Sequence, residues 1–194
     1  MKDASTDLPL LHFKNQNAWS AWLEKNHAKS SGVWLKLAKK GSETPSVSYA
    51  EALEEALRYG WIDGQKKALD ESFWLQKFTP RGPRSVWSKV NREKAEELMR
   101  SGRMKPSGLA AVERAKQNGR WDAAYDSQSR VSVPDDLQAE LDHHPKAKAF
   151  FSTLNSANRY AILWRLQTAK RVETRAKRLE QFIGMLERGE KFHP

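Results

Sequence analysis

Apolar and polar residues alternate in several short stretches of the N-terminal half. In residues 33–39, aliphatic side chains occupy every second position from Val33. A period of two is typical of a β-strand with two different faces. Residues 61–68 and 73–79 give two further predicted strands, joined by a short turn near Asp70. Together these segments predict a small antiparallel sheet of three strands.

Most of the remaining chain shows the apolar spacing of helices. The clearest predicted helix begins with Ser48 and Glu51, which form a capping box, and ends before Gly60. The last predicted helix covers residues 171–188, where apolar residues recur every three or four positions. The second half of the chain therefore reads as one helix after another.

These patterns predict an α+β protein. Its N-terminal half combines the small antiparallel three-stranded sheet with packed helices, and its C-terminal half is all-helical. The polar segment 126–133 is the best predicted linker. We therefore expect an α+β domain over residues 1–125 and a helical domain over residues 126–194.

Composition narrows the class of protein. The 194-residue chain has no cysteine, which excludes disulfides and thiolate zinc sites. No stretch approaches the roughly 20 apolar residues of a membrane helix, and the N-terminus lacks an apolar run of signal-peptide length. We expect a cytoplasmic protein without integral membrane association, and the oligomeric state stays open.

The formal net charge is +10. Such an excess favours polyanions, including nucleic acid, anionic lipid headgroups and phosphorylated small molecules. The charge alone names no ligand, and it fits equally well a basic protein that binds nothing in particular.

The densest cluster of chemically useful side chains falls between residues 61 and 91. Arg81 and Arg84 lie just before a predicted helix N-terminus, where free N–H groups favour anions. Guanidinium groups bind carboxylate or phosphate through two parallel bonds. We therefore predict a site for a small anionic ligand at this strand-to-helix junction. The candidate ligand-binding residues are Trp61, Asp63, Lys67, Arg81, Arg84, Ser85, Trp87, Ser88 and Asn91.

In this interpretation the two arginines hold the anion. Ser88 and Asn91 orient it, and Trp61 and Trp87 form the walls of the pocket. The alternative is a rigid Pro- and Gly-rich connector in which Arg84 pairs with a structural acid.

Signals for catalysis are absent from the sequence. It contains no P-loop, no GxGxxG and no GxSxG, and its five histidines lack the spacing of a metal motif. We predict no catalytic residue, no metal and no cofactor. Asp63 followed by Gly64 is chiefly a turn signal. The competing hypothesis is an uncharacterised enzyme with Asp63 as acid or base and Arg81 as electrophilic support.

Basic residues also crowd the start of the last predicted helix. The alternative nucleic-acid footprint there comprises Lys170, Arg171, Arg175 and Arg178. A basic ridge of this kind is usually a solvated face. Interleaved aromatic residues, which stack on bases, are absent from this helix except for Phe182.

Several short motifs stand out along the chain, at residues 60–64, 78–81, 85–91, 102–104 with 108–109, 119–121, 169–171 and 173–175. Together these motifs resemble the YdeI/OmpD-associated family of bacteriocin-protection proteins. The resemblance extends over about residues 12–190. It implies links to envelope stress, antimicrobial-peptide tolerance and a porin, but no established activity. It also favours residues 61–91 as the functional surface.

We therefore expect a non-enzymatic protein of the stress or bacteriocin-protection type. It would bind an anionic ligand or partner at the strand-to-helix junction. Nucleic-acid binding through the basic surface is the alternative.

Overall fold

The computed structural model describes residues 8–126 and 130–194, and the chain divides into two compact units. Unit 1 comprises Met1–Val86 and Asn91–Asp122, and unit 2 comprises Trp87–Val90 and Ala123–Pro194. The linker predicted at residues 126–133 lies partly outside the described residues. The domain boundary predicted between residues 125 and 126 stays a prediction.

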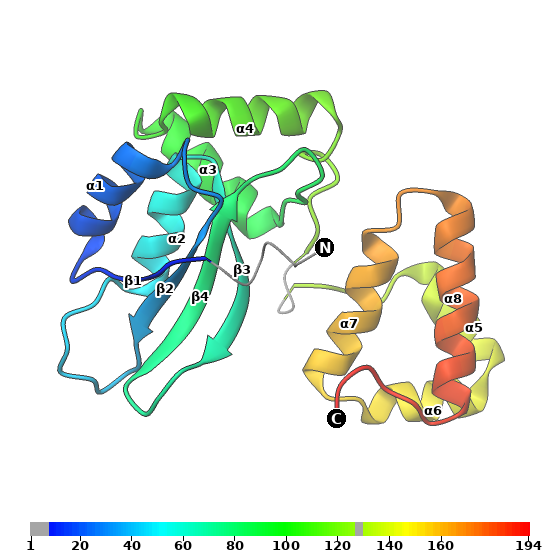
Figure 1. The fold of residues 1–194 in the computed structure, drawn as a ribbon. Helices are drawn as coiled ribbons and strands as arrows, with labels where there is room; N and C mark the ends of the chain where they lie inside the picture. The colour runs from blue at the N-terminus through cyan, green and yellow to red at the C-terminus, as the bar shows by residue number, and fades with distance from the viewer. Residues whose placement is uncertain (1–7, 127–129) are drawn as a thin grey trace, which may run out of the picture. The chain divides into compact units, whose positions relative to one another are not determined.

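Unit 1 contains a sheet of four strands (Figure 1). They are β1 (Leu10–His12), β2 (Val33–Ala38), β3 (Trp61–Ala68) and β4 (Phe73–Pro80), in the spatial order β1-β2-β4-β3. β4 is antiparallel to β2 and β3, whereas β1 is parallel to β2. The predicted mixture of helices and strands is confirmed. The predicted sheet of three antiparallel strands is wrong, because the sheet has a fourth strand, β1, which is parallel to β2. β1 has three residues, which is too short to show a period of two.

Helices α1 (Gln16–Asn26) and α2 (Tyr49–Arg58) lie against one face of this sheet (Figure 1). The ring of Trp19 on α1 lies 5.9 Å from the ring of Phe78, centroid to centroid. The strand residues on the same face are almost fully buried: Val33, Leu35, Leu37 and Phe78. Removing these apolar side chains from water provides the main stabilisation of unit 1.

The ends of α2 follow from local sequence. Ser48 and Glu51 form the predicted capping box, in which each side chain bonds to the backbone N–H of the other residue. Gly60 follows the helix with a φ of +74°, a conformation that favours glycine. Both predicted helix ends are confirmed. Helix α3 (Lys89–Arg100) starts with residues of unit 2 and continues in unit 1.

Helix α4 (Pro106–Gln117) packs closely on the end of α2. A Cβ atom at Gly108 would lie 2.3 Å from the carbonyl oxygen of Arg58. The backbone N–H of Lys105 donates to that same oxygen at 3.1 Å. Glycine at position 108 therefore permits the short distance between these two helices.

Strand β3 contains an irregularity at the position where the sequence predicts a turn. Asp63 pairs with Phe78, and the register then shifts before Lys66. The side chain of Gln76 is buried beneath this bulge and donates its Nε2–H to the carbonyl oxygen of Gly64 at 2.9 Å. The turn predicted at Asp63 and Gly64 is therefore wrong, because the strand continues through a β-bulge.

Unit 2 is helical in its described part. Its helices are α5 (Asp135–His143), α6 (Pro145–Thr153), α7 (Ser156–Gln167) and α8 (Val172–Glu187). They enclose a hydrophobic core whose largest fully buried members are Leu137, Leu141, Ile162 and Leu163. Across residues 8–126 and 130–194, no helix has the combined length and apolar character needed to cross a membrane.

Candidate functional site

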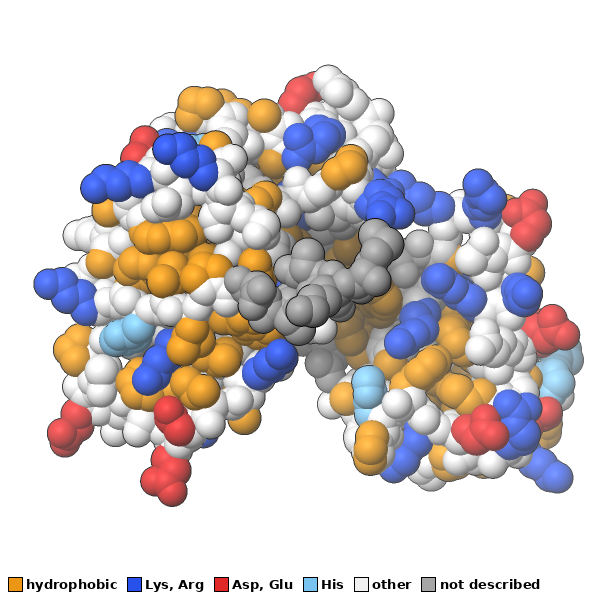
Figure 2. Space-filling view, viewed as in Figure 1, with side chains coloured by type: hydrophobic (Ala, Val, Ile, Leu, Met, Phe, Trp, Pro, Cys, Tyr) orange, Lys and Arg blue, Asp and Glu red, His pale blue; other side chains and the backbone are white. Residues whose placement is uncertain are grey.

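The sheet face opposite to α1 and α2 carries lysines among aromatic rings. Trp34 and Lys36 lie on this side of β2, and Phe73 and Lys77 lie on this side of β4. Lys67 joins them from β3. We call the surface formed by these five residues the lysine face. Figure 2 shows this side of unit 1 as a patch of hydrophobic side chains with Lys and Arg side chains at its edges.

Strand pairing determines how close the three lysines are. Lys36 and Lys67 both pair with Leu75, one from each neighbouring strand. Adjacent strands are about 4.8 Å apart, so the α-carbons of these two lysines are separated by about 10 Å. Lys77 pairs with Trp34, two residues along the strands from the pair of Lys36 and Leu75. The long lysine side chains can therefore bring all three ammonium groups to one polyvalent anion.

The aromatic rings position the ammonium groups. Lys36 Nζ lies 3.8 Å from the centroid of the Phe73 ring, and Lys67 Nζ lies 4.4 Å from that of Trp34. Lys77 Nζ is 6.0 Å from the Trp34 centroid. Trp34 is only 9% exposed and Phe73 only 8% exposed, so lysine side chains pack over the aromatic surface. The site therefore presents positive charge above an apolar floor.

No acidic side chain balances this charge within the described strands. The other residues on the same face, placed by their strand pairing, are Leu10, His12, Ala38, Ile62, Leu75 and Thr79. Within residues 8–126 and 130–194, none of the three lysines forms an ion pair. Uncompensated cations that lie together attract anions more strongly than the same cations held in salt bridges.

The predicted strand-to-helix junction is a loop in unit 1. Arg81 is only 5% exposed, and its Nη1–H donates to the carbonyl oxygen of Val86 at 3.1 Å. Its own carbonyl oxygen accepts from Arg114 Nη2 at 3.0 Å. Arg84 is exposed, and the Ser85 hydroxyl accepts from the backbone N–H of Gly82 at 3.0 Å. Arg81 therefore supports the loop, and Arg84 is the arginine of this pair with an exposed side chain.

The tryptophans assigned to a pocket wall are core residues. Trp61 is buried in unit 1, where its indole N–H donates to the carbonyl oxygen of His27 at 3.2 Å. Trp87 is buried in unit 2, and its carbonyl oxygen accepts from the backbone N–H of Tyr125 at 3.0 Å. Ser88 also belongs to unit 2 and forms a β-bridge with Tyr125, whereas buried Asn91 belongs to unit 1. The predicted residues are thus divided between the two units.

Asp63 lies on β3 at a partly exposed position. Its Oδ2 accepts a hydrogen bond from the Tyr49 hydroxyl at 2.9 Å. The enzyme hypothesis requires an enclosed carboxyl group at this position. Partial exposure gives that hypothesis no support, and the carboxylate instead ties α2 to the sheet.

Half of the predicted basic ridge serves the fold of unit 2. Arg175 bonds to both carboxylate oxygens of Asp136, at 2.6 and 2.8 Å, and to the carbonyl oxygen of Leu166. The bond from Arg175 lowers the pKa of Asp136 and raises the pKa of the guanidinium. Arg178 donates to the carbonyl oxygen of Arg165. The remaining two members, Lys170 and Arg171, are exposed.

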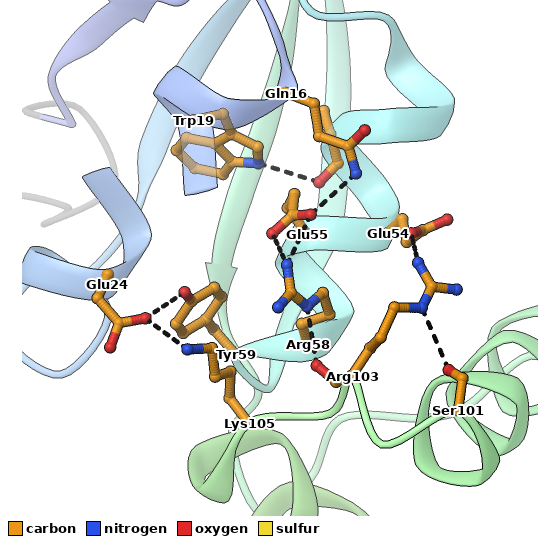
Figure 3. A network of polar contacts seen from close by, with 11 residues as sticks. Gln16, Trp19, Glu24, Glu54, Glu55, Arg58, Tyr59, Ser101, Arg103 and Lys105 are labelled. Carbon is orange, nitrogen blue, oxygen red and sulfur yellow. Dashed lines mark hydrogen bonds and ion pairs between the residues drawn. The ribbon is translucent and has the colours of Figure 1, made fainter. Parts of the chain in front are cut away.

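A separate polar network in unit 1 is structural (Figure 3). The carboxylate of Glu24 accepts from the Tyr59 hydroxyl and lies 3.0 Å from Lys105 Nζ. Hydrogen bonds from Tyr59 and Lys105 lower the pKa of Glu24. Burial and the bond to Glu24 raise the pKa of Tyr59. Each of these groups has a partner, so the network joins α1 to the start of α4.

Four of the five residues of the lysine face were not predicted from the sequence. Lys67 was in the predicted site, whereas Trp34, Lys36, Phe73 and Lys77 were not. The signal was the period of two in the strands, which separates Trp34 and Lys36 from the buried aliphatic residues of β2.

Across the described residues, no cluster of three or more His, Asp or Glu side chains could hold a metal ion.

Comparison with known proteins gives two family matches. A family model described as Domain of unknown function (DUF8412) matches residues 11–111. A second model, described as Bacteriocin-protection, YdeI or OmpD-Associated, matches residues 130–189 and confirms that resemblance for this segment. No curated protein and no solved structure matches the chain. The lysine face lies within the first match.

Proposed function

This chain belongs to the family described as domain of unknown function DUF8412, and from that premise we propose that it is a binding protein for anionic ligands. The observation that carries the proposal is the group of three lysines on one sheet face, where the described strands place no acidic side chain. The match of residues 130–189 supports a role of the bacteriocin-protection type. The binding role requires no catalytic residue.

The geometry favours a compact polyvalent anion over a stacked nucleic-acid base. A base stacks on an aromatic ring whose face is open. Here the rings of Trp34 and Phe73 are covered by lysine side chains, and the ammonium groups lie above them. Ion pairing with phosphate, carboxylate or sulfate groups uses these ammonium groups where they already lie.

The anion-binding site predicted at Arg81 and Arg84 is a secondary part of the proposal. Arg84 is exposed, so its guanidinium can make a bidentate contact with an anion at this loop. The guanidinium of Arg81 acts indirectly, because its bond to the carbonyl oxygen of Val86 shapes the loop that presents Arg84.

The test neutralises the lysine face. The triple variant Lys36→Gln, Lys67→Gln and Lys77→Gln is titrated with inorganic tripolyphosphate by calorimetry at low ionic strength. Each exposed charge contact contributes about 0.5–1 kcal/mol, so the variant should bind about 10- to 100-fold more weakly. The three lysine side chains are partly or fully exposed and their ring contacts are weak, so the variant should keep its fold. Far-UV circular dichroism should show this.

A matched control removes the same charge elsewhere. Lys25, Lys29 and Lys40 are exposed lysines of unit 1 outside the lysine face, and their replacement by Gln lowers the net charge equally. This control should retain affinity within about threefold, since general attraction falls only slightly. Equal weakening of both variants, or no binding by the unmodified protein, would contradict the proposal.

Nucleic-acid binding is the second candidate function. The net charge of +10 and the exposed Lys170 and Arg171 favour it. A polynucleotide bound through phosphates releases counterions, so affinity should fall steeply and linearly with salt on logarithmic axes. Anisotropy of a labelled single-stranded oligonucleotide measures this slope. A slope that is small and independent of oligonucleotide length would leave the small anion as the ligand.

A further inference from the structure

Unit 2 contains an open groove between α5 and α8 with a volume of about 480 Å³. Its floor comes from one stripe of α8, formed by Ala176, Leu179, Ile183 and Gly184. These positions recur with helical spacing, so they lie along one side of the helix. The floor is apolar over its whole length.

The rim of the groove is acidic. Glu180 and Glu187 of α8 and Glu140 of α5 line it, together with His144. His144 Nδ1 lies 2.8 Å from a carboxylate oxygen of Glu187, and its Nε2 lies 3.8 Å from one of Glu140. Among the described residues no lysine or arginine lines the groove, and the guanidinium of Arg188, which lies near Gly184, is paired with Glu190.

Gly184 keeps the floor open at a cost to the helix. Glycine in a helix interior is less favourable than alanine by about 1 kcal/mol. Its φ is not positive, and a Cβ atom there would meet only the flexible end of Arg188, at 3.3 Å. The packing of α8 therefore does not require glycine, whereas an occupant of the groove would use the space.

The spacing of the carboxylates indicates what kind of occupant fits. Within the described residues no three acidic or histidine side chains are close enough to hold one metal ion. Negative charge spread along an apolar floor instead complements an occupant whose positive charges flank its own apolar side chains. A neutral apolar molecule would not complement the negative charge of the rim.

We infer that the groove between α5 and α8 is a docking site for a cationic amphipathic peptide segment. Its apolar side chains lie on Leu179 and Ile183, and its lysines or arginines meet Glu140, Glu180 and Glu187. The site is independent of the lysine face, which carries the opposite charge and binds the opposite kind of ligand.

The experiment uses the full chain and a short fluorescein-labelled amphipathic helix of leucines and lysines, followed by fluorescence anisotropy. Gly184→Leu fills the floor and should weaken binding at least about tenfold, as steric occlusion of an anchor pocket does. Glu180→Lys reverses one rim charge and should weaken binding about fivefold. Glu43→Lys, an exposed loop position of unit 1 with the same charge change, should stay within about twofold.

Probe controls separate the groove from general attraction. The same peptide with glutamates in place of lysines should not bind. Replacing the three lysines of the lysine face by Gln should leave peptide affinity unchanged, so this inference and the proposed anion site can fail independently. Urea unfolding should show that the Gly184→Leu variant is folded.

Several results would overturn the inference. They are no binding by the unmodified protein, equal binding of the anionic peptide, and equal weakening by Glu43→Lys and Glu180→Lys. Concentration-dependent self-association that Gly184→Leu abolishes in sedimentation would also overturn it, because a second copy of the chain would then occupy the groove.

Discussion

Gly108→Ala tests whether a glycine sets the distance between α2 and α4. The replacement of glycine by alanine within a helix ordinarily stabilises it by up to about 1 kcal/mol. At position 108 the added Cβ would lie 2.3 Å from the carbonyl oxygen of Arg58 and 2.4 Å from the sulfur of Met104. Real Cβ atoms essentially never come within 3.0 Å of another heavy atom.

The expected cost follows from which neighbour can move. Met104 has a flexible side chain and can adjust. The Arg58 carbonyl is backbone at the end of α2 and also accepts from the Lys105 N–H at 3.1 Å. Moving it strains the packing by about 1–3 kcal/mol and weakens a hydrogen bond worth about 1 kcal/mol. After the gain from alanine is subtracted, Gly108→Ala should lower the free energy of unfolding by about 1–3 kcal/mol.

Gly184→Ala is the matched control, because a Cβ atom at that helical glycine would meet only the flexible end of the Arg188 side chain, at 3.3 Å. It should raise the free energy of unfolding of unit 2 by about 0.5–1 kcal/mol. Both variants are measured by urea unfolding, with far-UV circular dichroism and tryptophan fluorescence as probes. A Gly108→Ala variant as stable as the unmodified protein would refute the reasoning, since the helices would then have room to spare.

Two further predictions concern charged pairs. Glu55→Ala should lower the free energy of unfolding, measured in urea, by about 2–4 kcal/mol. Buried Glu55 pairs with Arg58 at 2.7 Å, and its loss leaves that guanidinium without the carboxylate. The control Glu54→Ala, which breaks the more exposed pair with Arg103, should lower it by about 1 kcal/mol or less. Arg175 lowers the pKa of Asp136, so this pair stabilises unit 2 above the unfolded pKa of about 4 and the contribution is lost as pH falls through the lower folded value. The stability difference between the unmodified protein and Asp136→Asn should therefore shrink between pH 6 and pH 3, and a constant difference would contradict the ion pair.

Local signals in the sequence predicted the ends of elements well. The capping box at Ser48 and the glycine after α2 depend on residues within a few positions of each other, so a single sequence contains all the information needed. The period of two in residues 33–39 likewise identified β2, because a strand with two different faces shows it directly.

Features that depend on distant residues were not predictable in this way. The bulge in β3 relies on the side chain of Gln76 from the neighbouring strand, so Asp63 and Gly64 alone resembled a turn. Arg81 was predicted to bind a ligand, but its side chain is buried. This burial results from packing around a loop, which the sequence alone does not show. The lysine face required the strand pairing that brings Lys36 and Lys67 to either side of Leu75.

The availability of basic residues, more than their number, determines where an anion can bind. Arg175 is already held by Asp136, and a ligand phosphate would have to replace that carboxylate and its two hydrogen bonds. Arg81 is buried, so contact with a ligand would require opening the loop. The three lysines of the lysine face have no ion pair to break within the described residues, and their ring contacts are weak enough to be exchanged for an anion. Binding there loses the least existing stabilisation, and neutralising those lysines should therefore affect affinity more than stability.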